Sequence, residues 1–128
     1  MSQQHPIILY VGGAAAGRAF LDYALSRGAW AYLAEDATES LGAYVAYTPD
    51  AVVLDLTAEP QTAGEVYHHL RSIEARPLFL LTRDRDWDIS VNEADEVYVL
   101  APDTAPGDLL EVIRAALEPI ELHPAFLY

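Results

Sequence analysis

A glycine-rich segment follows the first apolar run of the chain and could bind a phosphate. Gly12–Gly17 has the form G-x-A-x-x-G, a degraded dinucleotide-binding fingerprint in which glycines let a phosphate approach a helix N-terminus. Glu35 and Asp36 follow about twenty residues later, where that mechanism places an acid on the ribose. Because Ala14 replaces the middle glycine and no substrate domain follows, we interpret the glycines mainly as turn residues. A small-ligand or nucleotide sensor that uses Gly12–Gly17 stays open as an alternative.

Two further patterns contain metal-binding residue types. The acids of segment 84–95 have the spacing of a calcium loop, but Ile89 stands where the sharp turn needs glycine and the final bidentate Glu is absent. His68 and His69 are adjacent, so on a helix they point about 100° apart and cannot chelate one metal. No serine lies in an elbow motif, and no pair of carboxylates can be assigned to acid–base work. We therefore predict no metal site and no catalytic residues, and we expect that the protein is not an enzyme.

The chain is strongly acidic. Its 20 acidic and 7 basic residues give a formal net charge of −13 at pH 7, a field that repels nucleic acid and anionic lipid. All seven basic residues are arginines, which excludes any mechanism that needs a lysine, and the lack of cysteine excludes disulfides. Met1–His5 has no basic region, and the apolar run after it is too short for a signal peptide or membrane span. We expect a cytoplasmic protein with no membrane or nucleic-acid partner.

Short apolar runs alternate with amphipathic segments along the chain, which is typical of βα units around a parallel sheet. The runs are rich in Val, Ile, Leu and aromatic residues. We predict strands at Ile7–Val11, Ala29–Leu33, Ala51–Leu56, Leu78–Thr82 and Val97–Leu100.

Helices are predicted between these strands from their end signals and apolar spacing. Ala15–Arg27 meets Gly28, a favoured residue after a helix, and the capping-box-like segment Asp36–Glu39 starts a second helix. Pro106 suits the first turn of the last helix, which runs through Glu118. A short helix is expected in 84–96. The predicted inner faces carry Phe20, Leu21, Ala24 and Leu25; then Leu41, Tyr44 and Val45; then Ala63, Val66, Tyr67, Leu70 and Ile73; and finally Leu109, Leu110, Ile113 and Leu117.

An alternating (βα)₅ chain of this length suggests a flavodoxin-like, doubly wound α/β fold. We predict one domain over residues 1–118, with a five-stranded parallel sheet in the order 2-1-3-4-5 and helices on both faces. In such sheets ligands bind outside the carboxyl ends of the strands. The residues at those ends therefore decide the function.

The sequence resembles the receiver domain of two-component response regulators over Ile7–Leu117. The resemblance rests on AEDATES after the second strand, DAVVLDL in the third, LFLLT in the fourth and VYVLAP in the fifth. In that family an acid pair after the first strand binds Mg²⁺, and an aspartate that ends the third strand takes the phosphoryl group. A Ser/Thr ends the fourth strand and a Lys-Pro pair ends the fifth. The resemblance implies a regulatory domain of signal transduction.

Three positions match that pattern. The resemblance places Asp55 at the phosphoacceptor position, Thr82 at the hydroxyl position, and Tyr98 at the aromatic switch four residues before Pro102. We interpret Asp55 chiefly as a polar residue that ends a buried strand and caps a turn. Thr82 and Tyr98 are interpreted as packing residues, because such a switch needs a phosphoryl group to respond to.

Three other positions depart from the pattern, because Gly12 and Gly13 replace the acid pair and Ala101 replaces the lysine. Mg²⁺ needs hard oxygen ligands, so Asp55 alone makes a poor site. Without the metal and the ammonium, phosphoryl transfer loses its main electrostatic stabilisation. Arg83 could partly replace the lysine, although a solvated arginine is favoured. We expect a pseudo-receiver that binds a signalling protein through a face near the fifth strand. We expect it to need no cofactor. A receiver that is still slowly phosphorylated at Asp55 is the alternative.

The segment 119–128 extends past the receiver-like region and is strongly apolar. Its large apolar and aromatic residues are Ile120, Leu122, Phe126, Leu127 and Tyr128. The second and fifth strands are edges of the predicted sheet, and such a segment can add to an edge of its own or a neighbouring subunit. Packing across the last helix of the same chain is the alternative. We predict a homodimer that truncation after Glu118 weakens.

Overall fold

The computed structural model describes residues 5–55, 77–82 and 97–117. Within them, five strands form one sheet in the order β2-β1-β3-β4-β5, and every neighbouring pair is parallel. The strands are β1 (Ile7–Val11), β2 (Trp30–Ala34), β3 (Ala51–Asp55), β4 (Leu78–Leu81) and β5 (Val97–Leu100). The flavodoxin-like fold and its strand order are therefore confirmed.

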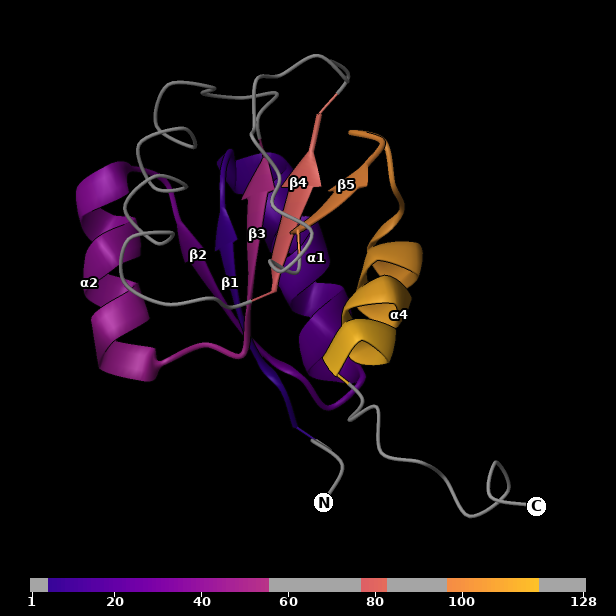
Figure 1. Ribbon diagram of the computed structural model, residues 1–128, viewed down its shortest axis with the longest axis horizontal. Helices are drawn as coiled ribbons and strands as arrows, with labels where there is room; N and C mark the ends of the chain where they lie inside the picture. The colour runs from indigo at the N-terminus through magenta and orange to yellow at the C-terminus, as the bar shows by residue number, and fades with distance from the viewer. Residues whose placement is uncertain (1–4, 56–76, 83–96, 118–128) are drawn as a thin grey trace.

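Helices cover both faces of the sheet (Figure 1). α1 (Ala14–Ser26) and α4 (Pro106–Leu117) pack on one face, and α2 (Ala37–Tyr47) packs on the other. The alternation of side chains along a strand supplies both faces with apolar groups. In β1, Ile8 and Tyr10 join the cluster under α1 and α4, whereas the residues between and after them join the cluster under α2.

The central strand β3 is buried at every position. Val53 belongs to the cluster on the α1 side, and Val52 and Leu54 belong to the cluster on the α2 side. Each fully buried side chain of this size contributes roughly 1.5–3 kcal/mol relative to exposure. A strand buried on both faces holds its terminal residue, Asp55, in a fixed place.

The turn between α1 and β2 corrects two predicted boundaries. Gly28 has a φ of +83°, which favours glycine and ends the helix as its position predicts. The amide of Ala29 donates to the carbonyl of Ala24 at 2.9 Å, so it belongs to the helix cap. For this reason β2 begins at Trp30, one residue later than expected. The helix itself runs over 14–26 instead of 15–27.

The start of α2 has the predicted cap. The Asp36 carboxylate accepts a hydrogen bond from the backbone amide of Glu39 at 2.7 Å, which satisfies one of the free amides of the first turn. The helix ends at Tyr47, and Thr48 follows in the left-handed conformation with a φ of 44°. Pro49 then prevents its continuation.

Two residues assigned to inner helix faces point to solvent. Leu25 is 49% exposed and Val45 is 73% exposed. Each follows a buried residue, Ala24 or Tyr44, and one position along a helix turns a side chain by about 100°. The inner faces are therefore narrower than the sequence pattern indicated. A strand boundary also differs from the prediction, because β4 ends at Leu81 and Thr82 follows the strand.

Several predicted features lie outside the described residues. They are the helix carrying the stripe 63–73, the connection 84–96, the tail 119–128, and the terminal residues Leu56 and Glu118 of two predicted elements. Among the residues that are described, no helix is long and apolar enough to cross a membrane.

Candidate functional site

The carboxyl ends of four strands meet at one edge of the sheet. Asp55 of β3 pairs with Leu81 of β4, and Leu81 pairs with Leu100 of β5, so these ends lie in line. β1 ends beside β3, because Val11 pairs with Leu54. The sequence-predicted residues that this register gathers at or directly after those ends are Gly12, Gly13, Asp55, Thr82 and Ala101.

Asp55 is buried and hydrogen-bonded to a tyrosine. Its side chain is only 6% exposed, and its Oδ2 accepts a hydrogen bond from the Tyr10 hydroxyl at 2.9 Å. Tyr10 is itself 2% exposed. A buried carboxylate without donors would be costly, so this hydrogen bond stabilises the charge at the sheet edge.

The strand register explains why Tyr10 reaches Asp55. Tyr10 pairs with Val53, and Asp55 lies two residues beyond Val53 on the same face of the sheet. The Tyr10 ring also stacks on Phe20 of α1, with ring centroids 5.7 Å apart. The sheet and the helix together fix the phenol in place.

The protonation of Tyr10 is set by the same surroundings. Burial raises the pKa of the Tyr10 hydroxyl far above its ordinary value near 10, and the charge and hydrogen bond of Asp55 raise it further. The phenol therefore stays neutral at physiological pH and acts as a hydrogen-bond donor. It cannot supply the positive charge that a lysine or a metal ion would bring.

Gly12 lies against this pair. A Cβ atom placed on Gly12 would lie 2.6 Å from the Cβ of Asp55 and 3.2 Å from the Tyr10 ring. No side chain fits at such a distance unless Asp55 moves, because the nearer atom is next to the backbone of a buried strand. Glycine is thus required here by close packing, and an acid at this position would displace the carboxylate.

The other strand ends have local backbone roles. The Thr82 amide donates to the carbonyl of Leu100 at 3.1 Å. Ala101 is exposed, and its carbonyl accepts hydrogen bonds from both the amide and the hydroxyl of Thr104, at 3.1 and 2.6 Å. The turn after β5 is therefore closed by its own backbone.

Tyr98 packs against the core. Its ring stacks on Phe79 of the neighbouring strand, with centroids 4.9 Å apart and planes 11° apart. The side chain is half-buried beside the cluster under α1 and α4. That Thr82 and Tyr98 serve in packing and not as a switch stays a prediction.

The donors that the structure describes at this edge do not fit Mg²⁺. Asp55 provides one carboxylate, and Gly12 and Gly13 offer no side-chain oxygen at all. No group of three His, Asp or Glu side chains that could hold a metal gathers anywhere in residues 5–55, 77–82 and 97–117. A receiver-type metal site would need at least one further carboxylate here.

Two of the three glycines of the possible nucleotide loop are explained by packing within the chain. Gly17 is buried in α1, where a Cβ would lie 2.4 Å from Leu33 Cδ1. It therefore lets the helix approach β2 closely, just as Gly12 lets β1 approach Asp55. Gly13 is the N-cap of α1 and makes no side-chain cap.

Some predicted site residues cannot be placed. Arg83, His68, His69 and the acidic segment 84–95 all lie outside the described residues. A contact between Arg83 and Asp55 thus stays a hypothesis.

Tyr10 is the site residue that sequence reasoning missed. The available signal was a tyrosine inside an otherwise aliphatic strand, two residues before the glycine pair. A buried tyrosine hydroxyl usually has a hydrogen-bond partner, and Asp55 is the buried acid on the adjacent strand.

Comparisons with known proteins identify the fold. The structure is similar to the chemotaxis response regulator CheY4 of Vibrio cholerae, with 18% identity, a TM-score of 0.73, and coverage of 88% of this chain and 99% of that one. It is also similar to the BeF3-activated N-terminal receiver domain of Klebsiella pneumoniae RstA (22% identity, 87% and 97% coverage, TM-score 0.72). A response regulator receiver protein from Burkholderia phymatum gives 23% identity, 90% and 99% coverage, and a TM-score of 0.69. At these identities the likeness shows a shared fold. No protein-family model and no curated protein sequence matches the chain.

Proposed function

We propose that this chain is a receiver-like regulatory domain of signal transduction that binds a protein partner and is not phosphorylated by the Mg²⁺-dependent route. The fold shared with response regulator receiver domains supports the regulatory role. The observation that carries the second part is the hydrogen bond from Tyr10 to the buried Asp55 at 2.9 Å.

The charges at the site support this proposal. Transfer of a phosphoryl group to Asp55 would bring further negative charge beside a buried carboxylate, and catalysis of that step depends on cations that neutralise it. Gly12, Gly13 and Ala101 supply none, and the Tyr10 phenol is neutral. Removing a single donor of this kind typically costs about 10²–10³ in rate, and at these three positions the residues that would supply or bind two cationic partners are missing.

A protein partner fits the edge formed by β5. Within the described residues this strand pairs only with β4, and Val99 on it is 50% exposed. Edge strands with exposed apolar side chains can bind an extended segment of another chain. The residues on either side of Val99, Tyr98 and Leu100, are half-buried and pack against the core cluster, which holds the edge strand in place.

Ligand-dependent thermal unfolding tests the proposal, because a ligand of the folded state raises the melting temperature by mass action. We expect no shift with Mg²⁺ plus beryllofluoride, whereas the receiver domain of Klebsiella pneumoniae RstA, described as BeF3-activated, serves as the positive control. A saturable rise would contradict the proposal and favour slow phosphorylation at Asp55. A saturable rise with adenine nucleotides alone would favour the nucleotide sensor that uses Gly12–Gly17.

A further inference from the structure

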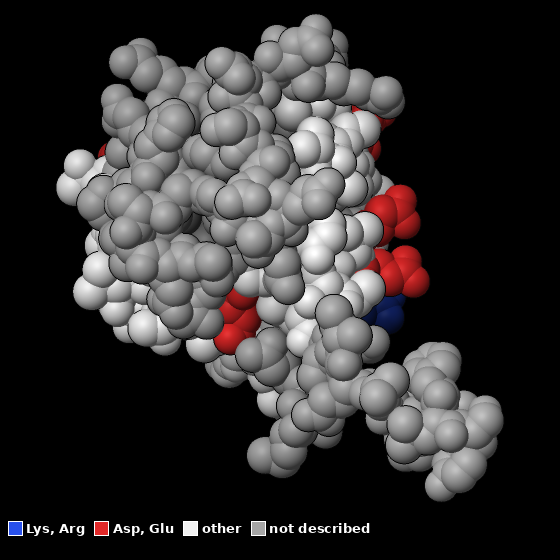
Figure 2. Space-filling model, in the orientation of Figure 1, with Lys and Arg blue, Asp and Glu red and all other residues white. Residues whose placement is uncertain are grey.

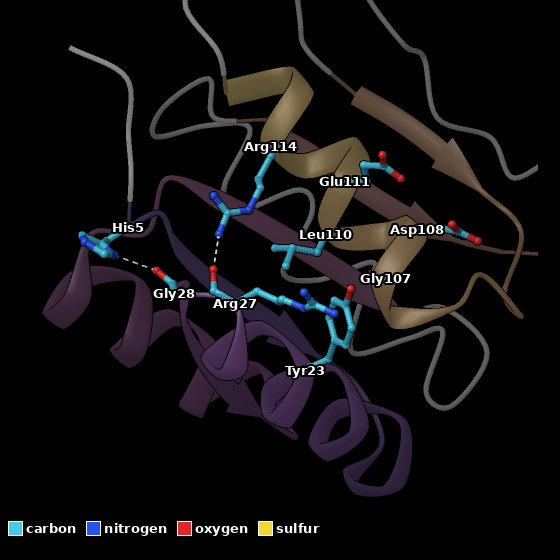
Figure 3. Close-up of a pocket in the computed structure, with 9 residues that line it drawn as sticks. All are labelled: His5, Tyr23, Arg27, Gly28, Gly107, Asp108, Leu110, Glu111 and Arg114. Atoms are coloured by element: carbon cyan, nitrogen blue, oxygen red, sulfur yellow. Dashed lines mark hydrogen bonds between the residues drawn. The ribbon is translucent and has the colours of Figure 1, made fainter.

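A groove of about 590 Å³ between α1 and α4 carries charges of both signs (Figure 3). The end of α1 contributes Arg27, and α4 contributes Asp108, Glu111 and Arg114. The half-buried ring of Tyr23 lines it between the two helices. The groove therefore combines an apolar surface with four ionised groups.

The two arginines lie together where the end of α1 meets α4. Arg114 donates through Nη2 to the backbone carbonyl of Arg27 at 2.7 Å, and the Arg27 guanidinium lies 5.1 Å from the centre of the Tyr23 ring. Within the described part of the chain neither guanidinium forms an ion pair with a carboxylate. Each has five donor groups, so most of their capacity is available to an anionic partner.

The two acids form an exposed ridge beside this basic side. Asp108 and Glu111 are three residues apart on α4, which places them on one side of the helix. Figure 3 shows both carboxylates pointing away from Arg27 and Arg114. Among the described residues visible in Figure 2, blue atoms appear at one place, directly beside red ones. Within the groove, an acidic ridge thus lies next to the two arginines.

This alternation of charge matters because the whole chain has a formal net charge of −13. Two copies of such a molecule repel each other wherever acidic surfaces meet. The described residues include three arginines, and two of them, Arg27 and Arg114, lie in this groove. It is therefore the described surface through which two copies can approach with complementary charges.

We propose that the groove between α1 and α4 is the contact surface of a homodimer. In a two-fold dimer the same patch of both copies meets, so each contact occurs twice. The Asp108 and Glu111 ridge of one copy would lie against Arg27 and Arg114 of the other, and the reverse contact would form by symmetry. The partner is a second copy because one surface carries both halves of the complementary pattern.

The dimer surface is separate from the proposed function. It includes Gly28 and His5, near the amino ends of the strands, whereas Asp55 lies at their carboxyl ends. A result on one therefore leaves the other standing.

Sedimentation velocity with two charge-reversal variants tests the dimer. Arg27→Glu and Glu111→Arg should each weaken self-association about tenfold or more, because every change replaces two symmetry-related attractions with repulsions. Arg18→Glu on α1 and Glu39→Arg on α2 carry the same charge changes outside the groove and should leave the dimer unchanged. Circular dichroism would check that all variants are folded.

Mixing the two groove variants gives the decisive result. A heterodimer of Arg27→Glu with Glu111→Arg restores complementary charges, so we expect dimers in the mixture that neither variant forms alone. The wild-type dimer should also weaken between 0.15 and 1 M salt, where the Debye length falls from about 8 to about 3 Å. A wild-type monomer at high micromolar concentration, a dimer insensitive to Arg27→Glu, or a mixture without heterodimers would each overturn the proposal.

Discussion

Replacing Tyr10 with phenylalanine removes the hydroxyl that donates to Asp55 and changes little else. The Tyr10 ring is buried and stacked on Phe20, so a phenylalanine ring can keep the same packing. A hydrogen bond to a charged group contributes roughly 1.5–3 kcal/mol net, and the buried Asp55 carboxylate would lose this donor. We therefore expect Tyr10→Phe to lower the free energy of unfolding by about 1.5–3 kcal/mol.

Urea unfolding followed by far-ultraviolet circular dichroism measures this loss, with an unchanged m-value as the sign that only stability has changed. Tyr32→Phe is the matched control, because Tyr32 stacks on Tyr47 and its hydroxyl has no hydrogen bond within the described residues. A double-mutant cycle with Asp55→Ala, which removes both acceptor oxygens, isolates the pair and should give a coupling energy of about 1 kcal/mol or more. A loss below about 0.5 kcal/mol for Tyr10→Phe, within the range of ordinary surface substitutions, would refute the structural role of this hydrogen bond.

Three further outcomes are expected. Gly12→Ala should lower the free energy of unfolding by about 1–3 kcal/mol, because the new Cβ would lie 2.6 Å from the Cβ of Asp55. Gly42→Ala is the control: a Cβ there meets nothing within 4 Å, so the free energy of unfolding should rise by about 0.5–1 kcal/mol. Equal effects of the two variants in urea unfolding would contradict the close packing at Gly12. Gly13→Asp should be tolerated, because Gly13 is the N-cap of α1 and has an extended backbone conformation that aspartate readily adopts. The new carboxylate should create weak Mg²⁺ affinity that calorimetry can measure. Millimolar or tighter Mg²⁺ binding by the unmodified chain would count against this account. The pKa of the Tyr10 hydroxyl is raised in the folded state, so its contribution to stability is complete below about pH 10 and is lost as the pH rises from there toward the folded-state pKa. The difference in unfolding free energy between wild type and Tyr10→Phe should therefore shrink when urea unfolding is repeated at increasingly alkaline pH. A difference that grew with pH would contradict this direction of the pKa shift.

The fold was predictable because its signals are local and repeated. Five apolar runs alternate with amphipathic segments, and Gly28 and Asp36 mark helix ends through backbone geometry that few other residues adopt or cap. The errors concern single positions. Leu25 and Val45 follow buried residues, and sequence spacing alone did not set the width of the buried face.

The candidate site was predictable only in part. The resemblance to receiver domains placed Asp55, Gly12 and Ala101 at one sheet edge, where the strand register puts them. The hydrogen bond from Tyr10 depends on a diagonal contact between β1 and β3 over 45 residues of sequence separation. The groove between α1 and α4 likewise joins residues far apart in the chain, including Arg27 and Arg114. Such contacts follow from the register and packing of the folded chain, which no local pattern contains.

Phosphoryl transfer to Asp55 can be measured directly from the intact mass of the protein. The chain is incubated with acetyl phosphate and Mg²⁺, alongside the Asp55→Asn variant, which lacks the acceptor carboxylate. We expect both masses to stay unchanged, because Gly12, Gly13 and Ala101 provide no charge for the reaction and the Tyr10 phenol holds the carboxylate. A stable gain of one phosphoryl group by the unmodified chain that is missing from Asp55→Asn would contradict the central claim.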